Sequence, residues 1–146
     1  MKTISHRCMK LATGNSYTDY HGQTTELTAQ ELDYFRQTVT NVLAATGIGI
    51  PVYCCDHEKL PGTTGDALGV HWRSIDGADE FITIDNYFIH EAYAVAFLDA
   101  FDLNGETLTT VLCHELAHIR YQRHTRYHAA LTAQYIDQCN RMEAAA

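Results

Sequence analysis

ETLTTVLCHELAHIRYQ, residues 106–122, carries the clearest helical pattern in this chain of 146 residues. Its large aliphatic side chains recur every three or four positions, at Leu108, Leu112, Leu116 and Ile119. Residues at that spacing share one face of an α-helix, so this stripe is expected to lie against a hydrophobic core. The stretch therefore predicts one helix from Glu106 to about Gln122.

The same stretch holds two histidines and a glutamate in the order His114-Glu115-Leu116-Ala117-His118. On a helix, His114 and His118 lie one turn apart on the same face, where their imidazoles can bind one metal ion. Glu115 follows the first of them directly, which lets its carboxylate reach a water molecule beside the metal. This pattern predicts a single zinc ion, with His114 and His118 as ligands and Glu115 as the general base of a hydrolytic reaction.

A catalytic zinc ion usually takes three protein ligands and keeps a fourth position open. The preferred candidate for the third ligand is His124, six residues after His118. A straight helix would turn His124 away from the metal, so the chain is predicted to bend between about Arg120 and Arg123. Thr125 can cap a following helix, which favours that break. Two other candidates for the third ligand stay open, His128 and Asp137.

Capping residues and periodicity predict three further helices. Thr28 and Glu31 form a T-x-x-E capping box, and apolar residues at helical spacing continue to Gly47, a typical helix-ending residue. Residues 91–101 are expected to form a short apolar helix or a turn-rich connection. A last helix is predicted from the cap at Thr125 to about Met142.

Strands are predicted between the first helix and residue 85. Ile48–Cys55 is rich in β-forming residues, and Pro51 suits an edge or the start of a strand. Val70–Ser74 and Phe81–Asp85 flank Asp76-Gly77, which predicts a hairpin. Residues 1–24 are expected to form a loosely structured lead-in with one edge strand, and a loop is expected at Pro61, Gly62 and Gly65. The length is that of a single domain.

The charge of the chain limits its partners. The formal net charge is -8, from 18 acidic and 10 basic residues. This balance argues against a general nucleic-acid binder, which needs basic surface to replace the counterions of the phosphates. No lysine or arginine occurs between Arg73 and Arg120, where nine carboxylates fall. That segment is either a solvated acidic face or the rim of a cleft that attracts a basic substrate.

The five cysteines occur at irregular spacing and in an odd number, which favours reduced thiols in a cytoplasmic protein over a disulfide framework. The N-terminus has no apolar segment of signal-peptide length. The longest apolar stretch, Ala92–Leu98, is far too short to span a bilayer. We therefore expect a cytoplasmic protein that does not cross a membrane.

The stretch from His114 to His124 resembles the zincin metallopeptidases that carry H-E-x-x-H followed by five residues and a third histidine. It is most similar to the small SprT-like, WLM-type and YgjP-type peptidases, because metzincins normally have glycine where Tyr121 stands. That group often has an aromatic residue four positions after the third histidine, where this chain has His128. The similarity is specific only over residues 114–124.

This resemblance implies an α+β, zincin-like fold. It would contain a small twisted β-sheet, an N-terminal helix, an active-site helix beneath the sheet and a C-terminal helix. In these enzymes a β-strand lies alongside the substrate, and Phe81–Asp85 resembles that strand. The resemblance also implies zinc-dependent cleavage of a protein or peptide substrate. DNA-linked substrates are known for SprT-like proteins, but the net charge argues against them here.

Three classes of function remain open on these residues. The first is a zinc endopeptidase, the second a binding or inhibitory module on a zincin scaffold, and the third a zinc hydrolase of a non-peptide bond. The intact Glu115 favours an enzyme, since a silent zinc site has no need of a carboxylate there. The donor that would stabilise an oxyanion is not selected among four candidates, Arg120, Tyr121, Tyr127 and His128.

Overall fold

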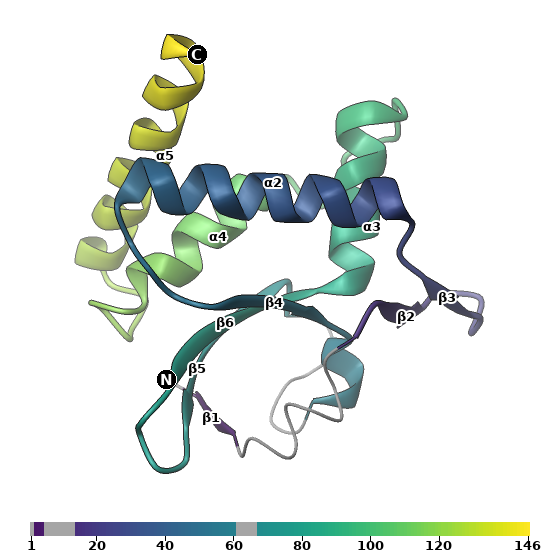
Figure 1. Ribbon diagram of the computed structural model, residues 1–146, viewed down its shortest axis with the longest axis horizontal. Coiled ribbons are helices and arrows are strands. Elements are labelled where there is room, and N and C mark those ends of the chain that lie inside the picture. The colour runs from purple at the N-terminus through teal and green to yellow at the C-terminus, as the bar shows by residue number, and fades with distance from the viewer. Residues whose placement is uncertain (1, 5–13, 61–66) are drawn as a thin grey trace.

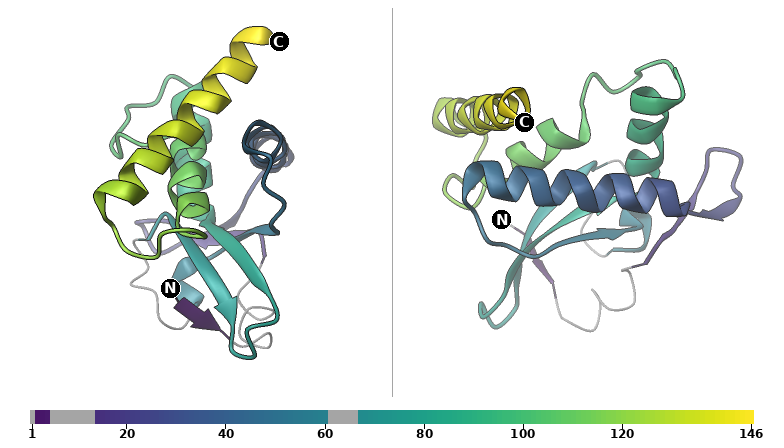
Figure 2. Two further views of the ribbon diagram at one scale, coloured as in Figure 1. Left: turned by 90° about the vertical axis from the view of Figure 1, so that its left-hand side faces the viewer. Right: turned by 45° about the horizontal axis from the view of Figure 1, so that its top comes forward.

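The fold is an α+β arrangement in which the α-helices lie together on one side of a small mixed sheet (Figure 1 and Figure 2). The computed structural model describes residues 2–4, 14–60 and 67–146. The α-helices of these ranges are α2 (Ala29–Thr46), α3 (Asn86–Phe97), α4 (Leu108–Ala117) and α5 (Arg126–Ala145). The four-stranded sheet contains β1 (Lys2–Ile4), β4 (Val52–Cys55), β5 (Gly69–Ser74) and β6 (Glu80–Asp85). The predicted α+β class is confirmed.

The predicted hairpin is also confirmed, and it forms the centre of the sheet. β5 and β6 pair antiparallel with His71 opposite Ile82, and the turn between them places Gly77 at φ 72°, which glycine adopts without strain. The strand order is β1-β5-β6-β4, and both outer strands run parallel to their neighbours. β4 is shorter than expected and lies at an edge directly after Pro51, which has no N–H to donate.

The two faces of β6 pack into different cores. Ile82 and Ile84 are fully buried in the main core, between the sheet and the helices. Phe81 faces the opposite way and packs with Trp72 in a smaller cluster. Thr83 shares that second face, where its hydroxyl oxygen accepts the indole N–H of Trp72 at 2.8 Å. The sheet is therefore buried on both sides.

The expectation that Phe81–Asp85 lies alongside a substrate is wrong for this fold. β6 is hydrogen-bonded to β5 on one side and to β4 on the other, so neither edge of it is open. The strand that faces α4 and its C-terminal end is β5.

α2 forms where the capping box predicted it. The Thr28 hydroxyl accepts the N–H of Glu31 at 3.1 Å, and the Glu31 carboxylate accepts the N–H of Thr28 at 2.9 Å. Gly47 ends the helix at φ 71°. Phe35 and Val42 are buried in the main core, and the helix contacts α3, α4 and α5. α2 therefore holds the helical layer together.

α4 is shorter than the sequence indicated. It ends at Ala117, whereas the apolar stripe predicted a helix to about Gln122. The N–H groups of His118 and Ile119 donate to carbonyls three residues back, which tightens the chain into a turn. Ile119 is the last large aliphatic residue of the stripe, so a longer helix would bury little more apolar surface. A break between α4 and α5, which His124 requires, is confirmed, but it begins directly after Ala117 and not at about Arg120.

α3 is longer at its start than predicted, since it begins at Asn86 and not at Glu91. Asp85 ends β6 and is also the residue before the helix, so no loop separates the two elements. Phe88 and Ile89 have only modest helix propensity, but both are fully buried. Their packing against the core, a tertiary contact, decides their conformation.

The first part of the chain has more regular structure than the expected loose lead-in. β1 supplies the predicted edge strand. Ser16–Thr18 (β2) and Thr24–Glu26 (β3) form a separate antiparallel pair, which the sequence did not indicate. The loop expected at Pro61, Gly62 and Gly65 lies outside the described residues.

The cysteines of the described ranges are free thiols, at Cys54, Cys55, Cys113 and Cys139. Cys113 on α4 and Cys139 on α5 lie in contact, with their sulfur atoms 3.8 Å apart. Burial raises the pKa of both thiols, so both stay protonated and pack as small apolar groups.

None of the helices in residues 14–60 and 67–146 combines the length and apolar character that crossing a bilayer requires.

Candidate metal centre

Three histidine side chains converge at the end of α4. The Nε2 atoms of His114, His118 and His124 form a triangle with sides of 3.1, 3.0 and 3.2 Å. Three ring nitrogens cannot all be joined by hydrogen bonds, because each carries either a proton or a lone pair, and two of the three must then have the same role. A tetrahedral zinc ion with bonds of about 2.0–2.1 Å holds its nitrogen ligands about 3.3 Å apart. The triangle therefore fits the ligand set of one metal ion.

The local structure explains how the three rings meet. His114 lies on α4 and His118 is the residue directly after its end, one turn further along, and the turn after Ala117 brings His124 back to the same place. The Nδ1 of His118 lies 3.0 Å from the carbonyl oxygen of Tyr121, which can accept only from an N–H. His118 therefore carries its proton on Nδ1 and presents the Nε2 lone pair to the centre.

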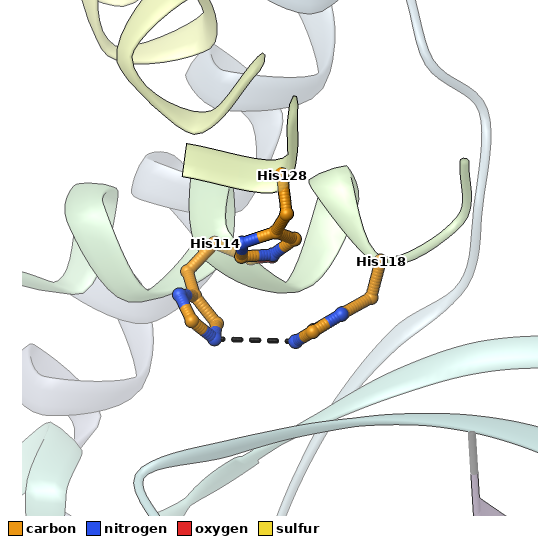
Figure 3. A group of neighbouring side chains, drawn as sticks. All are labelled: His114, His118 and His128. Carbon is orange, nitrogen blue, oxygen red and sulfur yellow. Dashed lines mark hydrogen bonds between the residues drawn. The ribbon is translucent and has the colours of Figure 1, made fainter. Parts of the chain in front are cut away.

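His128, the first alternative third ligand, also reaches this cluster (Figure 3). His114, His118 and His128 each offer a ring nitrogen within 4.8 Å of the others, so this trio could hold a metal ion. However, Nε2 of His128 donates to the carbonyl oxygen of His114 at 2.9 Å. Its ring lies 4.1 Å from that of His118, nearly parallel, at 28°. These contacts suit a residue that holds the two α4 histidines in place from α5.

Asp137, the other alternative, lies away from the cluster. Its carboxylate pairs with Arg141 at 2.9 Å, and its side chain is 56% exposed. It follows His128 by nine residues, which is about 13 Å along a helix. The structure therefore brings together His114, His118, His124 and His128, whereas Asp137 lies at the surface as the ion-pair partner of Arg141.

Glu115 is buried beside the three histidines. It is 6% exposed, and its Oε1 lies 3.9 Å from Nε2 of His114. Gly69 on β5 faces it so closely that a Cβ at that position would lie 3.0 Å from Cγ of Glu115 and 2.9 Å from a methyl of Val111. The backbone of β5 thus forms the wall opposite the carboxylate.

Burial keeps the α4 histidines neutral. Burial and, to a smaller extent, the neighbouring histidine rings lower the pKa of His114 and of His118 to about 4. Both rings are therefore uncharged at neutral pH. Their Nε2 lone pairs are then available without the loss of a proton, as metal ligation requires.

A cavity of about 300 Å³ opens onto this cluster. One wall is formed by His114, Glu115 and His118, and the other by β5. His71 on β5 lines it and is 5% exposed, with Nε2 lying 2.5 Å from the Glu80 carboxylate. His71 has no metal-ligand spacing in the sequence and was not a predicted site residue. It lies in the predicted strand Val70–Ser74, and its position two residues after Gly69 places both on one face of β5.

None of the four candidate oxyanion donors lines this cavity in the described part of the chain. Tyr127 is 55% exposed, and Arg120 and Tyr121 contact each other. Gln122 lines the cavity in their place, beside His124. Its amide N–H groups make it a better-placed donor than the four residues considered from sequence.

Comparison with family models, with curated proteins and with solved structures finds no match for this chain.

Proposed function

We propose that this chain is a zinc-dependent metallopeptidase on a zincin-like fold. His114, His118 and His124 would hold the ion, and Glu115 would be the general base. The proposal rests on one observation, the convergence of three Nε2 atoms within 3.2 Å of one another beside a buried carboxylate. Imidazole nitrogens suit zinc, and three protein ligands leave room for a reacting group, as in catalytic zinc sites.

The surrounding residues suit hydrolysis. When bound, zinc would lower the pKa of a water molecule in the cavity towards about 7 and polarise the carbonyl of the substrate. Glu115 would accept a proton from that water at its carboxylate and pass it to the leaving amine. Its burial limits competing bulk water, and the bond from His118 to Tyr121 fixes the ring that faces the ion.

The shape of the site supports an extended peptide as the substrate. β1 pairs with Trp72–Ser74 of β5, while the part of β5 that lines the cavity is Gly69–His71. In the described ranges, that part has no strand paired on the side away from β6. A peptide can add to such an edge through backbone hydrogen bonds, which places its carbonyls along the cavity.

Substitution of Glu115 by glutamine tests the proposal. Glu115→Gln keeps the size of the side chain but removes its basicity, so we expect it to bind zinc in a 1:1 ratio and to lose at least 100-fold in hydrolysis. Zinc content is measured by atomic absorption, and cleavage is measured with a panel of unfolded proteins and peptides.

Three outcomes would contradict the proposal. Equal cleavage by the parent and by Glu115→Gln would exclude Glu115 as the base. Stoichiometric zinc without cleavage of any panel member by the parent would favour a binding or inhibitory module. If the parent does not retain zinc after dialysis against buffer with trace zinc, the proposed metal centre itself is contradicted.

A further inference from the structure

The charges of this chain are segregated around the metal centre. Residues 116–136 contain no aspartate or glutamate, although the chain has 18 acids and only 10 bases. Three of the ten bases lie in that stretch, at Arg120, Arg123 and Arg126. We call these three residues the arginine rim. It is a local positive region on a protein whose net charge is -8.

The arginine rim is built around the proposed ligands. Arg120 is two residues from His118, while Arg123 and Arg126 are one and two residues from His124. Since consecutive Cα atoms lie about 3.8 Å apart, each arginine Cα is within about 8 Å of a ligand Cα. None of the three arginines lines the two cavities at the centre, so the rim borders the site and would contact side chains of a substrate that extends beyond it.

These guanidinium groups are exposed and have no acidic partner among the residues that the structure describes. The arginine and lysine ion pairs found there use Lys59, Arg73 and Arg141. The three arginines of the rim are exposed to solvent. Their N–H groups are therefore available to an anionic ligand without first breaking an ion pair.

Two tyrosines hold part of the rim in place. Arg120 lies over the ring of Tyr121 at 5.6 Å, and Arg126 lies over that of Tyr127 at 5.0 Å. Arg126 also donates to the Tyr127 hydroxyl at 3.0 Å. The two rings are near-parallel, at 27°, with centroids 6.0 Å apart. A guanidinium held over a ring loses less entropy when it binds a carboxylate through two N–H groups.

The opposite end of the site carries a negative charge. A second cavity, of about 210 Å³, shares Gly69, His114 and Glu115 with the first, so the two form one groove along α4. Glu106 lines the far end of this groove, where its carboxylate accepts a hydrogen bond from Thr110. The groove thus passes from Glu106, past Glu115, to the loop that bears the arginine rim.

We propose that this groove selects peptide segments with acidic side chains on the rim side of the scissile bond. This inference rests on the proposed function, because Glu115 sets where that bond lies. The rim supplies donors for carboxylates, and Glu106 repels them from the other end, so the charges also set the direction of the bound peptide. A nucleic acid fits less well, since its extended phosphate backbone would be repelled by a chain whose net charge is -8.

The test compares two charge-matched triple variants. One removes the rim, as R120Q/R123Q/R126Q, and the other removes three exposed bases elsewhere, as R36Q/K59Q/R141Q. Each is made in zinc-loaded Glu115→Gln protein, and binding is followed by fluorescence anisotropy. The three labelled probes are a neutral peptide and two peptides with Asp and Glu on either the N-terminal or the C-terminal side of the same neutral centre.

We expect one of the two acidic peptides to bind at least tenfold more tightly than the neutral one. The rim variant should lose that preference and keep both its zinc and its affinity for the neutral peptide, while the control triple variant retains it. The preference should weaken between 50 and 500 mM salt, since exposed charges are screened.

Equal binding of all three peptides, or equal losses in the two triple variants, would overturn the inference. So would a single-stranded oligonucleotide that binds as tightly as the acidic peptide and depends on the same arginines. Cleavage of the same peptides by the parent separates the two proposals. Cleavage without charge preference refutes the selectivity alone, whereas selective binding without cleavage refutes the peptidase.

Discussion

The ring of His118 has a different role at each of its nitrogens. Nδ1 donates to the carbonyl of Tyr121 at 3.0 Å, and Nε2 lies 3.0 Å from Nε2 of His124. The first contact fixes the tautomer that leaves the Nε2 lone pair free for the proposed metal ion. His128 supports the cluster in a different way, through its bond to the carbonyl of His114. Substitution of each histidine is therefore expected to change the zinc affinity by a different amount.

Zinc titration of single variants distinguishes these roles. His124→Ala removes one corner of the nitrogen triangle, so we expect loss of stoichiometric zinc. His128→Gln removes only support, and its zinc affinity should fall by about 10- to 100-fold. Asp137→Ala changes an exposed ion pair and should bind zinc as the parent does. The affinities are measured by competition with a chromophoric chelator. Wild-type affinity in His124→Ala would move the third ligand to His128.

Asp85 is a buried carboxyl remote from the metal ligands in sequence. Burial raises its pKa from 3.8 to about 6, although the N–H of His57 donates to it at 3.0 Å. A group with a raised folded-state pKa binds its proton more tightly in the folded protein. Its stabilising contribution is therefore present below about pH 4 and is lost as pH rises through about 6.

Asp85→Asn should remove this pH dependence. The free energy of unfolding of the variant, relative to the parent, should rise between pH 4 and pH 7.5 by on the order of 1–3 kcal/mol. Urea unfolding at several pH values measures it. Asp33→Asn, an exposed change on α2, is the control and should follow the parent at a constant offset. A constant offset for Asp85→Asn as well would contradict the prediction.

At the scale of elements, the position of α4 against β5 decides the geometry of the site. Gly69 allows this approach, because any Cβ there would meet Val111 at 2.9 Å and Glu115 at 3.0 Å. Valine has a stiff branched side chain that cannot turn aside easily. The strand and the helix would therefore have to separate to admit even one methyl group.

Gly69→Ala tests this packing. We expect a loss of stability of about 1–3 kcal/mol from overpacking, and a larger fractional loss of hydrolysis than of zinc affinity, because Glu115 is displaced and the histidines are not. Gly49→Ala is the matched control, since a Cβ there meets nothing within 4 Å and its φ is not positive. Denaturant unfolding, zinc titration and cleavage rate are compared. Equal effects of the two changes would exclude a special role for Gly69.

Element boundaries show what could be predicted locally and what could not. The start of α2 at its capping box and the start of α5 at Thr125 were predicted, because both depend on hydrogen bonds within a few residues. The early end of α4 and the early start of α3 were not. In those two places, packing against other elements decides where the helix ends or begins. The periodicity of the sequence reflects only local spacing and does not include these tertiary contacts.

At the scale of the whole molecule, the proposed metal centre lies where the end of α4 and the connection to α5 meet, and these two helices also share a core. α4 packs against α5, α2 and β5, and His124 lies in the connection between α4 and α5. A zinc ion held there would bind the folded chain and not the unfolded one, since the three nitrogens are brought together only by folding. Binding energy then adds to the stability of the fold.

Removal of zinc should therefore lower the melting temperature. With free zinc at 100 times its dissociation constant, the gain is about 2.7 kcal/mol, which for a domain of this size corresponds to about 5–10 °C. Differential scanning calorimetry with zinc and with EDTA measures the shift. His124→Ala should melt at the same temperature under both conditions. An equal zinc-dependent shift in that variant would assign the effect to another site.

The sequence by itself determined the order of the main elements and placed His114 and Glu115 on one helix with His118 one turn after His114, because helical spacing and capping act over a few residues. It also required a break before His124. Only the tertiary structure brought the Nε2 of His124 to the other two, set His128 behind them and placed Gly69 and His71 across the cavity. Those positions depend on how α4, α5 and β5 pack, and such contacts join residues too distant in the chain for any local pattern to encode.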